Sequence, residues 1–188
     1  MKKILLLSGV ACLMAVNAQA GIYNWQKSLI RPYIGADYVY SHAHQGNDAK
    51  NFKKNFHSGK ADLGMEWNKR IYTEFSYQMS GELKNANPYG DGKSKNSFQA
   101  YAMDLYGKMP IMCSNLGAVL TAGGAIYDIK YKQMPNSSTT KVGYRAGLGM
   151  QYDMTDNLSA RVIGRYSYIG TKRMNNLKEV TVGMLYRF

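Results

Sequence analysis

The sequence has no long apolar run after residue 20, and it has only 2 cysteines among 188 residues. A membrane-spanning helix needs about 20 consecutive apolar residues, so none is expected in residues 21–188. The CxxC, HExxH, P-loop and GxSxG patterns are also missing. These patterns mark redox, metalloprotease, nucleotide-binding and hydrolase sites. We therefore expect no cofactor and no metal site.

The N-terminus has the three parts of a secretory signal peptide. Met1-Lys2-Lys3 is basic, Ile4 to Val16 is apolar, and Ala18-Gln19-Ala20 is an Ala-x-Ala cleavage pattern. Such a start directs export and is removed from the mature protein. A buried N-terminal helix is the alternative. We predict a cleaved signal peptide over residues 1–20 and one mature domain over residues 21–188.

The cysteines add little to this prediction. A lipoprotein anchor at Cys12 is disfavoured, because Gly9 stands where that motif has Leu. Cys113 is the one cysteine of the mature chain, so no internal disulfide is expected, and its free thiol is more in keeping with a structural residue than with a catalytic one.

Acidic residues are scarce: 12 Asp and Glu stand against 24 Lys and Arg, a formal net charge of +12. Cleavage would remove Lys2 and Lys3 and no acid, so the charge would fall from +12 to +10. Nucleic acid is the usual partner of such a basic protein, but export argues against it. The expected partners are phosphate-rich lipid headgroups and glycans.

What the chain does have is apolar material in short alternating pieces. Residues 140–152 are a clear example, with Val142, Tyr144 and Leu148 on one face and Arg145 on the other. A period of two indicates strands, and Gly with β-branched and aromatic residues disfavours helix. The pattern predicts eight strands, near residues 32–41, 58–67, 70–80, 97–107, 115–127, 140–152, 158–168 and 178–188.

Strand length and loop length favour a membrane barrel. Each strand has about ten residues, enough to cross a bilayer at a tilt. The links 42–56, 81–96, 128–139 and 169–176 are long, whereas 68–69, 108–114 and 153–157 are short. We predict an all-β fold, an eight-stranded antiparallel transmembrane β-barrel with short periplasmic turns and longer extracellular loops. A soluble sandwich or lipocalin-like barrel is the alternative.

Aromatic residues support the membrane interpretation, because aromatic rings favour both bilayer interfaces. The strand directions predict a periplasmic girdle and an outer girdle. The periplasmic girdle comprises Trp67, Tyr152, Tyr186 and Phe188, and the outer girdle comprises Tyr40, Tyr77, Phe98 and Tyr168.

Three segments carry a family resemblance. They are Arg31-Pro32-Tyr33-Ile34-Gly35-Ala36-Asp37-Tyr38, the segment from Gly147 to Ser159, and Val182-Gly183-Met184-Leu185-Tyr186-Arg187-Phe188. The mature chain resembles the small porin-like outer-membrane β-barrels of the OmpA, OmpX and opacity-protein type. That resemblance implies recognition of the terminal strand by the barrel-assembly machinery, through Tyr186 and Phe188. It implies little about activity, because fold is a weak guide to function.

Charged residues recur on the face predicted to line the lumen. They are Asp37, Lys60, Asp62, Glu66, Glu74, Asp104, Arg145, Arg161, Arg165, Glu179 and Arg187. An eight-stranded barrel is only wide enough for side chains to fill it, and unpaired buried charges are costly. We expect a salt-bridged plug. A narrow ion path is the alternative.

Three histidines lie near the outer ends of the first two strands. His42, His44 and His57 are close in sequence to Ser41 and Ser58. A His-Ser pair would suit an enzyme that modifies lipid A, but no strained nucleophile motif supports this. His42-x-His44 offers too few ligands for a closed zinc site. We expect solvated loop histidines and no catalytic residue.

The predicted outer loops are basic. Their cations are Lys50, Lys53, Lys54, Lys84, Lys93, Lys95, Lys130, Lys132, Lys172 and Arg173. Such a rim can pair with lipopolysaccharide phosphates or with a host polyanion, or it can simply face water. We expect a monomeric, non-enzymatic surface barrel with a structural or adhesive role. A small porin-like channel is the first alternative, and a lipid-modifying enzyme is the second.

Overall fold

The computed structural model describes residues 30–44, 55–81, 83–86, 93–111, 115–131, 137–170 and 175–188, and it contains strands and turns. The predicted signal peptide and Cys113 lie outside these ranges. No helix in these ranges is long and apolar enough to span a membrane. The strands are β1 Arg31–His44, β2 Asn55–Glu66, β3 Ile71–Ser80, β4 Leu83–Ala86, β5 Lys93–Pro110, β6 Leu116–Tyr131, β7 Ser137–Asp153, β8 Leu158–Tyr168 and β9 Asn176–Arg187.

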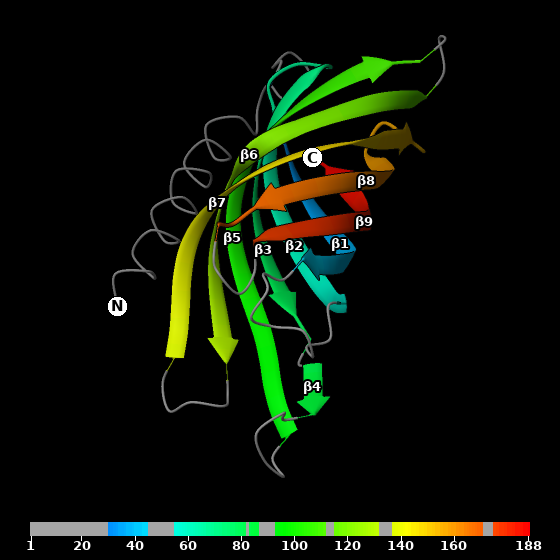
Figure 1. Cartoon of the computed structure of the whole chain (residues 1–188). Helices are drawn as coiled ribbons and strands as arrows, with labels where there is room; N and C mark the ends of the chain where they lie inside the picture. The colour runs from blue at the N-terminus through cyan, green and yellow to red at the C-terminus, as the bar shows by residue number, and fades with distance from the viewer. Residues whose placement is uncertain are drawn as a thin grey trace.

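Eight of these strands close into a barrel (Figure 1). Sequence neighbours pair antiparallel, β1 pairs with β9, and β3 pairs with β5 to complete the ring. β4 pairs only with β5, as an extension above the wall. Closure removes the unpaired edges that an open sheet would expose. The predicted eight-stranded antiparallel barrel is confirmed.

Short polar turns connect the strands at the end where the chain terminates. Asn68 Oδ1 accepts hydrogen bonds from the N–H groups of Arg70 and Ile71, both at 2.8 Å. Thr155 Oγ1 accepts from Leu158 N at 3.0 Å. Side-chain oxygens that bond nearby backbone N–H groups favour tight turns. The chain can therefore reverse within a few residues after β2 and after β7.

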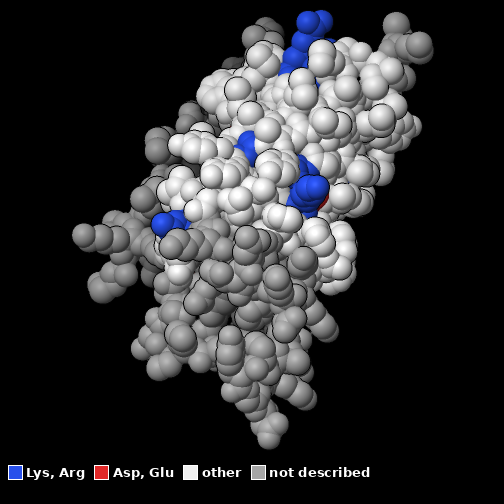
Figure 2. All heavy atoms as spheres, viewed as in Figure 1, with Lys and Arg blue, Asp and Glu red and all other residues white. Residues whose placement is uncertain are grey.

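The alternation predicted from sequence sets the two faces of the wall. On β8, Ser159, Arg161, Ile163 and Arg165 are buried, whereas Val162 and Tyr166 are exposed. Figure 2 shows one face of the molecule, on which the described atoms are mostly uncharged. Lipid meets every second residue of a barrel strand, so this apolar outer surface is the bilayer-facing one.

Phe98 is a correction to the predicted outer girdle. Its side chain is 1% exposed and packs inside the barrel against Phe56, with ring centroids 5.3 Å apart. On β5 the outward residues are the odd-numbered ones, such as Met103 and Leu105. Phe98 therefore has the right height for a girdle but points to the lumen.

Strands continue into the predicted long loops, furthest in two of them. β4 pairs with Lys93–Asn96, inside the predicted loop 81–96, and β6 and β7 remain paired through Tyr131 and Ser137, inside the predicted loop 128–139. β5, β6 and β7 are consequently 18, 16 and 17 residues long. A strand crosses the bilayer in about 9–11 residues. Part of each therefore extends beyond the bilayer, as the β4–β5 and β6–β7 hairpins of Figure 1.

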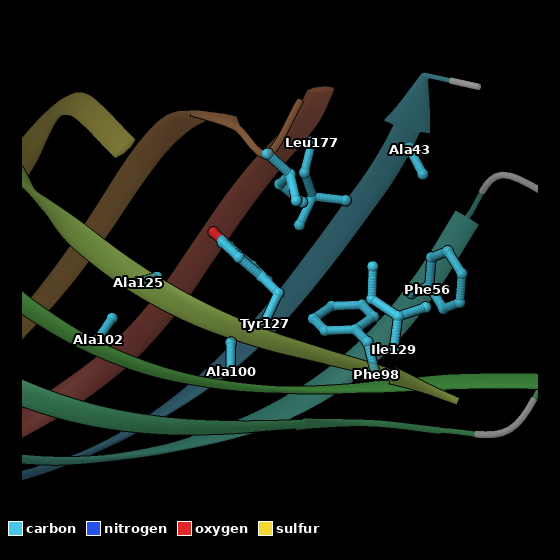
Figure 3. Close-up of a cluster of buried hydrophobic side chains, with 10 residues drawn as sticks. Ala43, Phe56, Phe98, Ala100, Ala102, Ala125, Tyr127, Ile129 and Leu177 are labelled. Carbon is cyan, nitrogen blue, oxygen red and sulfur yellow. The ribbon is translucent and has the colours of Figure 1, made fainter. Parts of the chain in front are cut away.

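Apolar side chains fill both halves of the lumen. The outer cluster lies near the ends of the long loops and includes Ala43, Phe56, Phe98, Tyr127 and Leu177 (Figure 3). The inner cluster lies nearer the short turns and consists of Tyr33, Tyr72, Tyr106, Val119, Ile163 and Leu185. The charged residues of the lumen contact one another between and around these clusters.

Candidate functional site: the filled lumen

Arg161 on β8 is the centre of the lumenal charge network. Its guanidinium Nη2 lies 2.7 Å from Asp37 Oδ2 and 2.9 Å from Asp62 Oδ2, and Nη1 lies 2.5 Å from Glu74 Oε2. These side chains are all 0% exposed. A planar guanidinium has five donors in a fixed fork, so one arginine can bind three carboxylates from β1, β2 and β3.

Lys60 provides the second positive charge of this group. Its Nζ lies 2.8 Å from Asp37 Oδ2, 3.0 Å from Asp62 Oδ1 and 3.2 Å from Glu74 Oε1. The central group thus contains three acids and two bases, all buried. Breaking such a group by removing one partner strands buried charge, which is expensive.

Inward-facing glycines make room for these carboxylates. A Cβ at Gly183 would collide with the Asp37 carboxylate, and a Cβ at Gly123 would collide with Asp104. Both glycines stand directly opposite the acid on the adjacent strand. The glycine content of the inner face is therefore a packing requirement of the charge network.

A second group of charges lies beside the first. Arg145 on β7 donates to Asp104 through Nε at 2.7 Å and through Nη2, and Nη2 also donates to Ser76 Oγ at 2.9 Å. Arg165 Nη2 lies 3.6 Å from Asp104 Oδ2. Glu179 Oε1 accepts from Ser41 Oγ at 3.1 Å and from Gln78 Nε2 at 2.9 Å.

Tyrosine hydroxyls tie the charges to the inner apolar cluster. Tyr33 donates to Glu74 Oε2 at 3.1 Å and Tyr106 donates to Glu74 Oε1 at 2.8 Å. The Tyr106 ring stacks on Tyr72 with centroids 4.7 Å apart. Arg165 Nη2 donates to the Tyr106 oxygen at 2.9 Å. Hydrogen bonds therefore link the polar groups of the lumen to the inner apolar cluster.

A third group closes the periplasmic end. Arg187 donates to Glu66 Oε2 through Nε at 2.7 Å and to Ser159 Oγ through Nη1 at 2.6 Å, and its Nη2 lies 3.2 Å from Asp153 Oδ1. Lys108 also pairs with Asp153. Sequence reasoning missed Lys108 and Asp153 because both were assigned to turns. Their opposite charges beside strand ends were the available signal.

The structure brings all eleven predicted lumenal charges inside the barrel. Ten are buried, and Glu66 is half-buried at the rim. Ion pairs join the predicted charges within each of the three groups except at Glu179, whose hydrogen-bond partners Ser41 and Gln78 are neutral. In the described ranges, no group of three or more His, Cys, Asp and Glu residues is placed to hold a metal ion.

The histidines and serines point to opposite sides of the wall. Ser41 and Ser58 are buried in the lumen, whereas His42, His44 and His57 are exposed on the outer surface. Neighbouring residues on a strand face opposite ways, so the Ser41–His42 step cannot place a hydroxyl beside its imidazole. The His-Ser pair considered from sequence does not form.

The predicted rim cations fall into two sets. Lys84 is on β4, Lys93 and Lys95 are on β5, and Lys130 is on β6. The register places Lys84 opposite Lys95. Lys50, Lys53, Lys54, Lys132, Lys172 and Arg173 lie outside the described residues.

The girdle residues other than Phe98 lie on the outer surface or at its edges. Tyr40, Trp67, Tyr152, Tyr168, Tyr186 and Phe188 are exposed and Tyr77 is half-buried. At the terminal strand, the rings of Tyr186 and Phe188 meet edge to face with centroids 5.4 Å apart. Phe188 N also donates to Pro32 O at 3.1 Å, which fixes the chain end against β1.

Curated relatives match parts of this chain. A 25 kDa outer-membrane immunogenic protein of Brucella ovis is 37% identical over 70 residues, which are 37% of this chain and 34% of that protein. An uncharacterized protein of Coxiella burnetii is 24% identical over 123 residues, 51% of this chain and 50% of that protein. The matched regions thus span half or less of these relatives.

Solved structures share the fold over most of the chain. The crystal structure of Neisserial surface protein A superposes with a TM-score of 0.65 at 17% identity, covering 84% of this chain and 97% of that one. Ail, the attachment invasion locus protein of Yersinia pestis, gives 0.60 at 16% identity, covering 84% and 98%. At such low identity the likeness concerns the fold.

The sequence family described as the outer membrane protein beta-barrel domain matches residues 5–188. That range includes every strand of the barrel. Together with the closed eight-stranded wall and its apolar outer face, this match shows that the chain belongs to the outer membrane protein β-barrel family and lies in the outer membrane.

Proposed function

We propose that this protein is a non-conducting, non-enzymatic surface barrel that binds polyanions through the hairpins rising above its outer rim. The observation that carries the proposal is the filled lumen. Two apolar clusters and three charged groups occupy the space that a channel would need. An eight-stranded barrel has no room beyond its side chains, so binding falls to the outer surface.

The hairpins carry the charge for this role. The region considered comprises β4, residues 93–98 of β5, β6, and residues 137–142 of β7. It contains one acid, Asp128, and five lysines, which are Lys84, Lys93, Lys95, Lys130 and Lys141. Lys84 and Lys95 occupy directly opposed positions. Like charges so placed repel, and a bound polyanion relieves that repulsion.

A precedent for the ligand class comes from one structural neighbour. Ail of Yersinia pestis has been crystallised in complex with the heparin analogue sucrose octasulfate, in a structure with a TM-score of 0.54 to this chain at 17% identity. Sulfate and phosphate esters present the same kind of anionic oxygens to lysine. The proposal extends that ligand class to the β4–β5 and β6–β7 hairpins.

A binding assay with matched variants tests the hairpins. Fluorescent heparin is titrated onto the protein in phosphatidylcholine vesicles. The variant Lys84→Gln/Lys95→Gln should bind about tenfold more weakly, because one ion pair with a polyanion contributes up to about 1 kcal/mol. The control Lys69→Gln/Arg70→Gln removes two charges at a periplasmic turn and should bind like the unmodified protein. Equal binding by both variants would reject the hairpins as the site.

Planar-bilayer recording tests the filled lumen. We expect no steady single-channel conductance from the folded protein. Reproducible conductance that changes with Glu74→Gln would favour the channel function and contradict the plug. Heparin binding is a separate readout, so the two parts of the proposal can fail independently.

A further inference from the structure

Near its outer edge, the lipid-facing wall changes from apolar to basic and aromatic side chains on four neighbouring strands, β8, β9, β1 and β2. Along β9, the outward residues Met184, Val182 and Val180 are apolar and exposed, and the next outward residue is Lys178. Along β1, Tyr38 and Tyr40 are followed outward by His42. A patch of basic and aromatic side chains therefore replaces the apolar surface there.

The register brings these residues together. Lys178 stands opposite His42 on β1 and opposite Tyr166 on β8. Tyr40 stands opposite His57 on β2. Directly opposed residues have Cβ atoms about 4.5–5.5 Å apart. Lys178, His42, His57, Tyr40 and Tyr166 thus form one contiguous patch, here called the wall patch.

The wall patch lies just inside the outer boundary of the hydrocarbon. Lys178 is eight residues from Tyr186 of the periplasmic girdle. Eight antiparallel residues span about 27 Å along a strand, or about 20 Å of height at a tilt near 40°. The apolar band of such barrels is about 25 Å tall. The Lys178 backbone therefore lies about 5 Å below the outer boundary of that band, and its long side chain can extend to place the ammonium among the outer-leaflet headgroups.

Contacts with neighbouring side chains orient the histidines of the wall patch. The Tyr38 hydroxyl contacts His57 Nδ1, and the Tyr40 ring packs on His57 with centroids 5.4 Å apart. His42 Nδ1 lies 2.6 Å from Asn55 Oδ1. A hydroxyl that donates to Nδ1 places the imidazole proton on Nε2, where it can donate to an anion. Neighbouring side chains thus hold both imidazoles of the wall patch in place.

Lys178 has no counter-ion among the residues that the structure describes. No carboxylate in the described ranges lies within ion-pair distance of its ammonium, and the lumenal acids are behind the wall. A lysine on the lipid-facing side is destabilising unless it meets the polar interface. An anionic headgroup at that level would give it a partner.

We propose that the wall patch binds the phosphate group of a phosphorylated lipid in the outer leaflet. Lys178 supplies the charge, His57 and His42 supply neighbouring polar groups, and the tyrosine rings lie against the sugar or acyl part of the lipid. Lipid A has the required chemistry, because its phosphates lie at the membrane surface. This site faces the bilayer and is separate from the hairpins that bind soluble polyanions.

Native mass spectrometry of the full protein in phosphatidylcholine nanodiscs tests the site. Nanodiscs contain either diphosphoryl lipid A or lipid A stripped of phosphate, and the retained lipid is counted after detergent release. We expect about fivefold greater retention of the phosphorylated form, in line with one charged contact. Lys178→Gln should abolish this preference, and Lys178→Arg should preserve it, since arginine also binds phosphate.

Controls separate the site from general charge and from misfolding. Lys69→Gln removes a lysine at the periplasmic end and should leave retention unchanged. Heat-modifiable migration checks that each variant is folded, and His57→Phe, which keeps a ring, should reduce retention about threefold through one lost hydrogen bond. Unchanged preference in folded Lys178→Gln would overturn the proposal. Displacement of lipid A by millimolar inorganic phosphate would also overturn it, by showing a site for the free anion.

Discussion

Arg161 on β8 and Glu74 on β3 form a bidentate ion pair across the lumen. Nη1 lies 2.5 Å from Oε2 and Nη2 lies 3.2 Å from Oε1, with both side chains fully buried. Three strands, β9, β1 and β2, separate these two in the sheet. The pair therefore joins opposite sides of the barrel wall, and its loss should lower the stability of the whole barrel.

Replacement of Arg161 by Gln should destabilise the barrel strongly. Asp37, Asp62 and Glu74 would then share Lys60 as their remaining positive partner. Leaving buried charge uncompensated costs about 3–5 kcal/mol. Urea unfolding in lipid vesicles, followed by tryptophan fluorescence, measures the change. Arg70→Gln, at an exposed turn, should shift the free energy of unfolding by less than about 0.5 kcal/mol. A similar small shift for Arg161→Gln would contradict the central role of this residue.

Glycine positions should divide into sensitive and tolerant ones. Gly183→Ala should cost about 1–3 kcal/mol, because the new methyl group collides with Asp37 in a packed interior. Gly59→Ala and Gly107→Ala should be neutral or slightly stabilising, because nothing lies within 4 Å of a Cβ there. The same unfolding measurement compares the three variants. Equal costs at all three positions would show that backbone effects outweigh the collision.

Phe98 should matter more than an aromatic residue on the outer surface. Phe98→Ala leaves a cavity beside Phe56 and should cost about 3–5 kcal/mol. Tyr144 is 75% exposed on the outer face, so Tyr144→Ala should cost much less. Thermal unfolding monitored by heat-modifiable gel migration distinguishes them. The reverse order would restore Phe98 to the outer girdle.

Phe188→Ala should slow assembly more than it lowers stability. The resemblance of the terminal strand predicts recognition of Tyr186 and Phe188 during insertion, whereas in the folded barrel the Phe188 ring is 54% exposed and contacts mainly Tyr186. Pulse-labelled protein should reach the heat-modifiable form several-fold more slowly in cells. Purified Phe188→Ala barrels should unfold near the urea concentration of the unmodified protein. Normal assembly kinetics would reject the recognition role.

The faces of the strands could be predicted because side chains alternate with a fixed period of two. Val142, Tyr144 and Leu148 follow that period without interruption, and the structure exposes all three. Phe98 departs from the predicted outer girdle because its aromatic type suits an interface, whereas its even position on β5 turns the ring to the lumen. The β4–β5 hairpin could not be predicted because the Lys, Asn and Gly residues of this segment are typical of loops. In the structure, pairing with β5 keeps β4 extended.

The partners of the lumenal charges could not be predicted from the sequence. Which acid meets Arg161 or Arg145 depends on the stagger of all eight strands and on side-chain reach across the lumen. Asp104, for example, pairs with Arg145 two strands away, at 2.7 Å. Alternation gives the side of the wall on which a residue lies. It does not give the relative heights of residues on opposite sides of the lumen.

The cross-lumen pairing of Arg161 with Glu74 bears on how the barrel enters the membrane. In a flat sheet, β8 and β3 would be four strand spacings apart, about 19 Å, beyond the reach of any ion pair. Arg161 and Glu74 can form their ion pair only when the sheet curls and β3 pairs with β5. A half-open sheet in lipid would hold several unneutralised charges as well as unpaired strand edges, both costly there. Closure and neutralisation thus become a single event, and insertion is expected to be all-or-none.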